Sequence, residues 1–138
     1  MKTYVIDTNA LISFVTDRNP AQQQKIADIF DEAARLKSTI ICPQNALTEF
    51  VYVLDKVYGN EKRKIRSMIK EFIALPGVKI VNDVDFELVL KFWPKPLPDY
   101  GDAIVASVCR SHQGATVATF DRKLINALKK LNIDFACL

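Results

Sequence analysis

Residues 3–15 read TYVIDTNALISFV, and this stretch contains the pattern on which the fold depends. Its first four residues are β-branched or aromatic and predict a short strand over 3–6, which ends at Asp7. The apolar residues that follow predict a short helix over 10–15. A strand that passes directly into a helix is typical of α/β proteins, in which strands and helices alternate.

The same alternation continues along the chain. Further strands are expected over 39–42, 78–81, 116–120 and 133–136. Helices are expected from Asn19-Pro20 to about 34, over 45–57, from 61 (capped by Asn60) to about 75, from Asp83 or Asp85 to Trp93, and over 100–112 and 122–131. The hairpin signals Asn-Gly and Asp-Gly do not occur. The prediction is a single α/β domain over 1–138 in three layers, with a mainly parallel sheet of about five strands and helices on both faces.

Composition excludes several function classes. The chain has 138 residues with 49% apolar and 25% charged, and its net charge of +3 is compatible with binding to nucleic acid. The single histidine, His112, excludes a zinc site built from several histidines and is expected at a helix C-terminus. The four isolated glycines exclude a dinucleotide fingerprint and a Walker loop. Three scattered cysteines and no long apolar run predict a cytoplasmic protein without a membrane span.

Four acids occupy positions that suggest a site. Asp7 and Asp121 directly follow predicted strands, and ligands of open parallel sheets bind beyond the carboxyl ends of the strands. Asp102 opens the helix over 100–112. Glu49 lies on the helix over 45–57, whose apolar residues on more than one side predict that it is largely buried, so a charge there needs a partner, a metal or a wet cleft.

A purely structural alternative exists for each of these acids. Asp7 and Asp121 can cap the helices that follow them, and Asp99 can do so for the helix that contains Asp102. Asp102 then lies in the first turn, where the helix dipole favours it. Glu49 can lie at the edge of a less buried helix. The remaining acids are expected on polar helix faces or near helix starts; among them are Asp28, Asp31, Glu32, Asp55, Glu71, Asp83, Asp85 and Glu87.

Carboxylates without histidine or thiol partners suit hard cations, Mg²⁺ or Mn²⁺. Two such ions about 3.5–4 Å apart can hold both the attacking water and the leaving oxygen of a phosphodiester. Hydrolysis of nucleic acid is therefore the reaction that the four acids, on a mildly basic domain, favour most.

With these residues in view, the chain resembles a PIN domain, and most of all the VapC-type toxins of prokaryotic toxin–antitoxin pairs. The resemblance is carried by Val-Ile-Asp-Thr-Asn-Ala-Leu at 5–11, Leu-Thr-Glu-Phe at 47–50, Gly-Asp-Ala-Ile-Val-Ala at 101–106 and Thr-Phe-Asp-Arg-Lys-Leu at 119–124. The blocks follow one another in the family's order. The stretch 55–95 carries no family signature.

The resemblance implies a metal-dependent endoribonuclease that uses Mg²⁺ or Mn²⁺ and is the toxin of a type II toxin–antitoxin pair. The residues it implies as metal-binding and catalytic acids are Asp7, Glu49, Asp102 and Asp121. Asn9 and Thr119 match positions that support the site through hydrogen bonds. Asp99 matches a more variable position, where it either adds a fifth carboxylate or only caps its helix. Family members commonly form homodimers, and the toxins bind a small antitoxin that blocks the cleft.

Two alternatives remain beside the toxin. One is a solitary PIN nuclease of RNA processing, which has no antitoxin. The other is a phosphoacceptor receiver domain, also α/β and Mg²⁺-dependent. A receiver needs a pair of acids after its first strand, whereas Asp7 stands alone, and Asn82-Asp83 is a weak phosphoacceptor candidate.

Two surfaces are expected to bind partners. Arg122 and Lys123 flank Asp121 and are predicted to contact RNA phosphates, whereas the basic run over 62–70 is either a second RNA surface or a solvated helix face. The other surface comprises apolar residues of the helices over 10–36 and 45–75, namely Phe14, Tyr52, Val53 and Tyr58. They either belong to the core or form a groove for an amphipathic antitoxin segment that directs a Lys or Arg at the acids.

Overall fold

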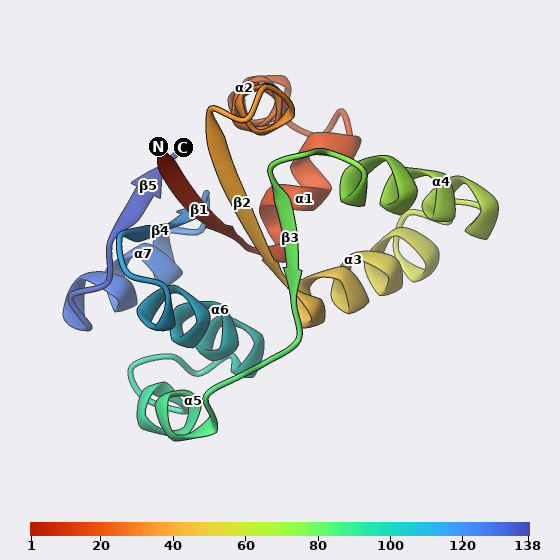
Figure 1. Ribbon diagram of the computed structural model, residues 1–138. Coiled ribbons are helices and arrows are strands. Elements are labelled where there is room, and N and C mark those ends of the chain that lie inside the picture. Colours follow the sequence, from red (N-terminus) through yellow and green to blue (C-terminus); the bar gives the residue numbers. More distant parts are fainter.

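A five-stranded sheet forms the centre of the computed structural model, which describes residues 1–138 with all side chains except that of Cys137 (Figure 1). The strands are β1 (Lys2–Ile6), β2 (Ser38–Pro43), β3 (Val78–Val81), β4 (Ala115–Thr119) and β5 (Phe135–Cys137). Their order in the sheet is β3-β2-β1-β4-β5. All four pairings are parallel, and Val5 of β1 lies between Ile41 of β2 and Val117 of β4. The predicted fold class is therefore confirmed.

Four helices cover one face of the sheet: α1 (Thr8–Val15), α2 (Pro20–Ala34), α3 (Gln44–Lys56) and α4 (Lys62–Ile73). Side chains alternate along β1, so Tyr4 and Ile6 point into this layer. They pack with residues such as Ile26, Phe50 and Phe72 from three of the helices.

Three helices cover the opposite face: α5 (Phe86–Phe92), α6 (Tyr100–Ser111) and α7 (Arg122–Lys130). Val5 points into this second core, where it packs with Val108 of α6 and Leu128 of α7. Seven consecutive residues of α6, from Ala103 to Cys109, are buried, which anchors the start of this helix firmly against the sheet. His112 is the C-cap residue of α6, as expected.

Two local expectations are wrong. Asn60 does not cap α4, because its N–H donates to the carbonyl of Leu54 and thereby closes the end of α3; Glu61 is the N-cap residue instead. The helix α3 is also less buried than expected. It packs on the sheet through one face only, and Tyr52 on the other face is 64% exposed.

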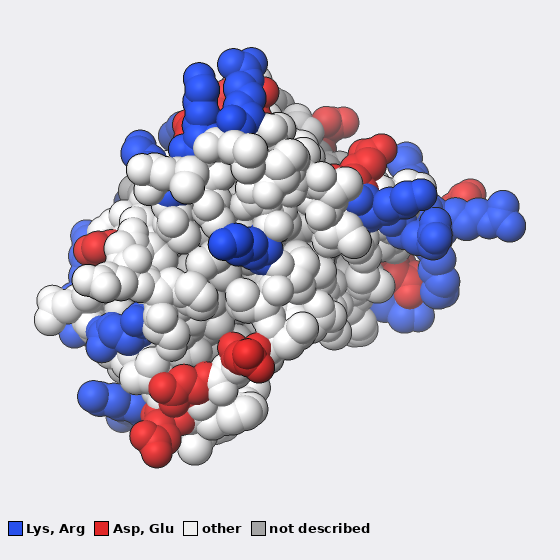
Figure 2. All heavy atoms as spheres, in the orientation of Figure 1, with Lys and Arg blue, Asp and Glu red and all other residues white. Residues whose placement is uncertain are grey.

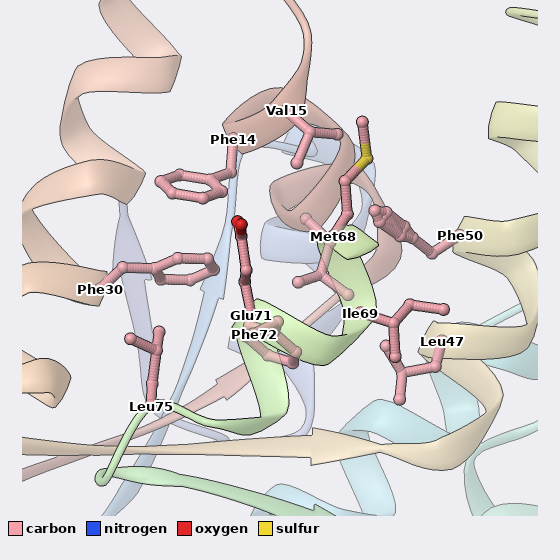
Figure 3. A pocket seen from close by; sticks show the side chains of 11 residues that line it. Phe14, Val15, Phe30, Leu47, Phe50, Met68, Ile69, Glu71, Phe72 and Leu75 are labelled. Carbon is pink, nitrogen blue, oxygen red and sulfur yellow. The ribbon is translucent and has the colours of Figure 1, made fainter. Parts of the chain in front are cut away.

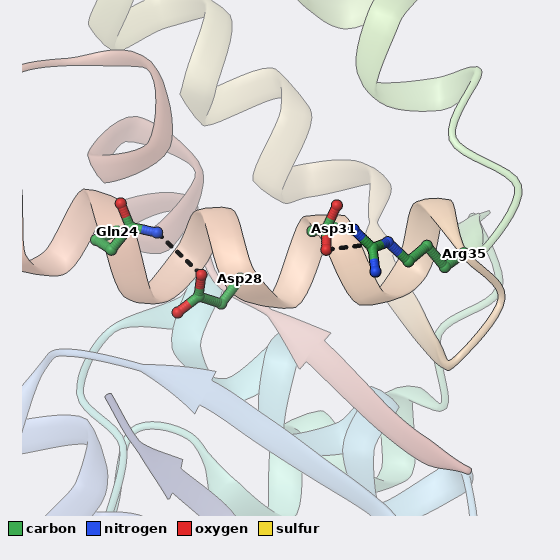
Figure 4. A network of polar contacts seen from close by, with 4 residues as sticks. All are labelled: Gln24, Asp28, Asp31 and Arg35. Atoms are coloured by element: carbon green, nitrogen blue, oxygen red, sulfur yellow. Dashed lines mark hydrogen bonds and ion pairs between the residues drawn. The ribbon is translucent and has the colours of Figure 1, made fainter.

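The longest helix, α2, shows how most acids are accommodated. Asn19 caps its start by accepting a hydrogen bond from the Gln22 N–H. On its outer face Gln24 donates to Asp28 over 2.9 Å, and Arg35 pairs with Asp31 over 3.2 Å (Figure 4). These acids lie on a polar helix face, as predicted.

A membrane crossing requires a long helix of mainly apolar residues, and none of the helices described above meets this requirement.

Candidate active site

The strand order reverses between β1 and β4, because β2 and β3 lie on one side of β1 and β4 and β5 on the other. In open parallel sheets the crevice beyond this switch point is the usual ligand site. Here it opens into a cavity of about 300 Å³. Five carboxylates line this acid cavity: Asp7, Glu49, Asp99, Asp102 and Asp121. The structure thus brings together all the acids that the sequence singled out.

Asp7 is the most enclosed of the five acids, with 4% of its surface exposed. Its Oδ1 accepts a hydrogen bond from the Ala10 N–H over 2.9 Å, which caps α1. Its Oδ2 accepts from the Thr119 hydroxyl over 2.6 Å. The same hydroxyl oxygen accepts from the Asp121 N–H over 3.0 Å. Thr119, which is fully buried, therefore connects the ends of β1 and β4.

An acid can cap a helix and line the acid cavity at the same time. Asp99 accepts from the Asp102 N–H over 2.9 Å, and Asp121 accepts from the Lys123 N–H over the same distance. Both caps use Oδ1, so the Oδ2 atom of each acid remains for a ligand in the cavity. From the sequence, capping a helix and lining a ligand site were alternative interpretations of each acid. In the structure the same acids do both.

Glu49 lines the cavity for a different reason from the one expected. It is exposed on the partly buried helix α3 instead of being enclosed by apolar side chains. Its Oε2 accepts a hydrogen bond from the Thr8 hydroxyl over 2.9 Å. Its Oε1 lies so close to Gly101 that a Cβ built on that glycine would be 2.5 Å away. The carboxylate is thus fixed between the start of α1 and the start of α6.

Burial and neighbouring negative charge raise the pKa values of two acids of the cavity, Asp102 and Asp7. Burial, followed by the charges of Asp99, Asp7, Asp121 and Glu49, raises the pKa of Asp102 from 3.8 to about 7. Burial raises the pKa of Asp7 from 3.8 to about 6, although the hydrogen bonds from Thr119 and Ala10 favour its charged form. A cavity with this excess of negative charge favours protons or cations.

The residue types in the cavity fit a hard divalent cation. All five acids offer oxygen, and Asn45, one helical turn before Glu49, adds a buried Oδ1 with no hydrogen-bond partner among the described atoms. Such an orphaned acceptor is costly unless a ligand or water satisfies it. No three of the described His, Cys, Asp or Glu side chains already surround one point closely enough to hold a metal ion. The carboxylates share the cavity without being drawn together.

Sequence reasoning did not single out several residues of the cavity, among them Thr8, Asn45, Gly101 and Arg18. Thr8 and Gly101 adjoin predicted acids, and Asn45 is four positions before Glu49, so their places in the chain could have indicated them. Arg18, which lies in the loop between α1 and α2, has no such signal. Asn9, which was predicted, lines the cavity and is exposed.

The basic residues lie where the sequence suggested. Arg122 and Lys123 are exposed at the start of α7, next to Asp121. The five basic residues of α4 are also exposed, and Figure 2 shows Lys and Arg gathered over the outer end of this helix. Lys62 in this group pairs with Asp55 over 3.7 Å.

The predicted apolar surface divides into separate parts. Phe14 lines an apolar groove of about 190 Å³ between α1, α2, α3 and α4, where its ring lies 4.3 Å from that of Phe30 (Figure 3). Glu71 is the one charged residue among the described lining of this groove. Val53 and Tyr58 line the acid cavity instead, and the exposed Tyr52 lines neither. Of the four residues, only Phe14 lines the apolar groove.

Solved structures at 18% sequence identity share this fold. A chain in the structure of VapBC2 from Rickettsia felis, bound to a DNA fragment from its promoter, aligns over 97% of both chains with a TM-score of 0.68. PAE2754 from Pyrobaculum aerophilum aligns over 91% of this chain and 84% of its own, with a TM-score of 0.63. The PIN domain endonuclease Utp24 aligns over 94% and 78%, with a TM-score of 0.54.

No curated protein is significantly similar to the sequence. A sequence profile of the PIN domain family, however, matches residues 4–130, which include all five acids of the cavity. This match excludes the receiver alternative, and Asp83 accordingly lies outside the described lining of the acid cavity. The chain belongs to the PIN domain family.

Proposed function

We propose that this PIN domain is a metal-dependent endoribonuclease, which hydrolyses RNA phosphodiester bonds in the cytoplasm as the toxin of a toxin–antitoxin pair. PIN domains are generally nucleases. The observation that carries the proposal is the meeting of five carboxylates in one cavity at the switch point of the sheet. A bound Mg²⁺ or Mn²⁺ would lower the pKa of an attacking water and stabilise the leaving oxygen.

In this proposal the residues of the acid cavity have different roles. Asp7, Glu49, Asp102 and Asp121 are the metal-binding acids, and Asp99 adds a fifth carboxylate while it caps α6. Thr119 donates to Asp7 and orients it, Thr8 donates to Glu49, and Gly101 leaves the space that the Glu49 carboxylate occupies. Asn9 supports the site from the cavity wall.

The catalytic and the capping interpretations predict different mutants. Asparagine caps a helix about as well as aspartate does, so Asp7→Asn and Asp121→Asn should keep their helices intact. Because each change removes a charged metal ligand, both should abolish RNA cleavage. Both should also reduce the rise in Tm that added Mn²⁺ causes. For the unchanged protein that stabilisation reaches about 2.7 kcal/mol at a hundredfold excess over Kd.

The assay is incubation of the purified protein with mixed RNA, with and without Mn²⁺, followed by mapping of the RNA ends and by thermal melts. Asp28→Asn on the outer face of α2 is the matched control, because Asp28 lies outside the cavity. Full cleavage by both cavity mutants, with an intact Mn²⁺ shift, would contradict the proposal.

The toxin role adds an antitoxin, and we propose that an amphipathic antitoxin segment fills the apolar groove and directs a Lys or Arg toward the carboxylates. The groove and the acid cavity are both lined by residues of α1 and α3, which supports this arrangement. The likeness to VapBC2 supports it at the level of the fold. We also propose that the protein forms a homodimer, as other family members do.

The likeness to the endonuclease Utp24 keeps a second candidate, a solitary nuclease of RNA processing. Expression alone and together with the product of the neighbouring gene separates the two. A toxin should harm its host when expressed alone and should be recovered in a complex on co-expression. A chain that is harmless and stays uncomplexed favours RNA processing.

A further inference from the structure

Arg18 is the only basic residue among the described lining of the acid cavity, where it faces five carboxylates. It nevertheless makes no ion pair with any of the described acids. The ion pairs of the described residues involve Asp31 and Asp55, which lie elsewhere. The positive charge of Arg18 is therefore not paired with any of the carboxylates that line the cavity.

The guanidinium is held by neutral acceptors instead. Its Nη2 donates to the Asn9 carbonyl over 3.1 Å and to the Ser13 hydroxyl oxygen over 3.0 Å. Ser13 is fully buried, and its own hydroxyl donates to Gln22 Oε1 over 3.3 Å, so that a lone pair remains for Arg18. A guanidinium has five N–H donors. Both donors of Nη2 are thus used, while Nε and Nη1 retain three donors for a ligand.

The five carboxylates repel the phosphates of RNA, so a cation held beside them would favour binding of the strand. We propose that Arg18 is a positioning residue that binds a backbone phosphate of single-stranded RNA and so holds the strand over the carboxylates. Arginine suits this role because its charge is permanent and because the N–H groups of Nε and Nη1 are free to donate to phosphate oxygen. The inference rests on the proposed nuclease function and adds a substrate contact to it.

The test compares Arg18→Gln, Arg18→Lys and a matched control, Arg35→Gln. Arg35 is also exposed, but it pairs with Asp31 at the far end of α2. The first measurement is fluorescence anisotropy of a labelled single-stranded RNA, without metal, from 50 to 200 mM salt. Loss of one phosphate contact should lower the slope of log affinity against log salt by about 0.7. Over this fourfold range the parent should lose affinity about 2.6-fold more than Arg18→Gln does.

The second measurement is cleavage kinetics with Mn²⁺. Arg18→Gln should raise KM more than it lowers kcat, and it should leave the Mn²⁺-induced rise in Tm in place. Arg18→Lys keeps the charge and should retain most of the salt slope, while Arg35→Gln should match the parent. A parental slope in Arg18→Gln, or a fall in Tm with unchanged KM, would overturn the proposal.

These results also separate the two proposals. A parent that binds RNA but never cleaves it contradicts the nuclease function, and the anisotropy slopes still decide the role of Arg18. A parent that cleaves RNA while Arg18→Gln keeps its slope contradicts only the role of Arg18. A parent that neither binds nor cleaves RNA contradicts both.

Discussion

One hydroxyl group connects the two strand ends that form the acid cavity. The Thr119 hydroxyl donates to Asp7 Oδ2 and its oxygen accepts from the Asp121 N–H, so a single buried side chain fixes two acids that are 114 positions apart in the chain. The hydrogen bond stabilises the charged form of Asp7 and opposes the effect of burial on its pKa. The deprotonated carboxylate is the form that binds a cation.

Thr119→Val should therefore impair the site while it keeps the side-chain shape. It should raise the pKa of Asp7 above its value of about 6 and lower the free energy of unfolding by about 1–3 kcal/mol, because the Asp121 N–H loses its acceptor. The pH of half-maximal Mn²⁺-dependent cleavage should move upward. Thr119→Ser keeps the hydroxyl and should resemble the parent. Identical pH profiles for the two variants would show that the hydroxyl has no such role.

Three helices begin at the acid cavity, namely α1, α6 and α7, and each is capped by one of its acids. The positive ends of the helix dipoles thus point at carboxylates, which stabilises the charged acids to a modest degree. The start of α6 also has a steric requirement. Gly101 leaves the space that the Glu49 carboxylate occupies.

Gly101→Ala should displace the Glu49 carboxylate and strongly reduce RNA cleavage, although alanine favours a helix by about 1 kcal/mol over glycine. Tm without metal should stay the same or rise, and the Mn²⁺-induced rise in Tm should shrink. The control is a double-mutant cycle with Glu49→Ala, in which Gly101→Ala should have little further effect on either measurement. Equal effects of Gly101→Ala in both backgrounds would contradict the steric explanation.

The start of α7 is where RNA phosphates are expected. Changing Arg122 and Lys123 to Gln should lower the salt slope of RNA binding by about 1.4, at about 0.7 per contact. Changing Lys129 and Lys130 to Gln removes the same charge from the far end of α7 and should leave the slope close to that of the parent. An unchanged slope in the first variant, measured by RNA anisotropy, would refute the contact.

Across the whole molecule, a net charge of +3 coexists with a cavity that concentrates five acids. Apart from Arg18, the basic residues lie outside the described lining of the cavity, notably on α4. The five acids therefore repel one another in the folded chain, whereas in the unfolded chain they lie far apart.

Burial of Asp102 and Asp7, together with this repulsion, should make the metal-free protein less stable as pH rises. The pKa values of about 7 for Asp102 and about 6 for Asp7 exceed the ordinary value of 3.8, so between pH 4 and 7 the folded state binds protons that the unfolded state has released. The free energy of unfolding should fall across this range and level off above it. Added Mn²⁺ should reverse the loss near neutral pH, where it meets deprotonated acids.

Urea unfolding with a chelator or with Mn²⁺, from pH 4 to 8, measures this dependence. Asp102→Asn should flatten the metal-free profile, while Asp28→Asn should leave it unchanged. A metal-free stability that rises from pH 4 to 7 would contradict the raised pKa values of Asp102 and Asp7.

The strands, the helices and the places of the three acids that end strands or open helices could be predicted from the order of residues alone. These features depend on short-range properties, such as side-chain period, β-branching and caps at Asn19, Asp85 and Asp99, which are readable along the chain. Glu49 was also predicted, but for the wrong reason, because how much of α3 the sheet covers is a property of packing. Only the tertiary structure brought Thr119 against Asp7 and set Asn45 and Arg18 in the cavity. Such contacts arise from the order of parallel strands and the crossovers between them, and no local pattern of residues encodes that order.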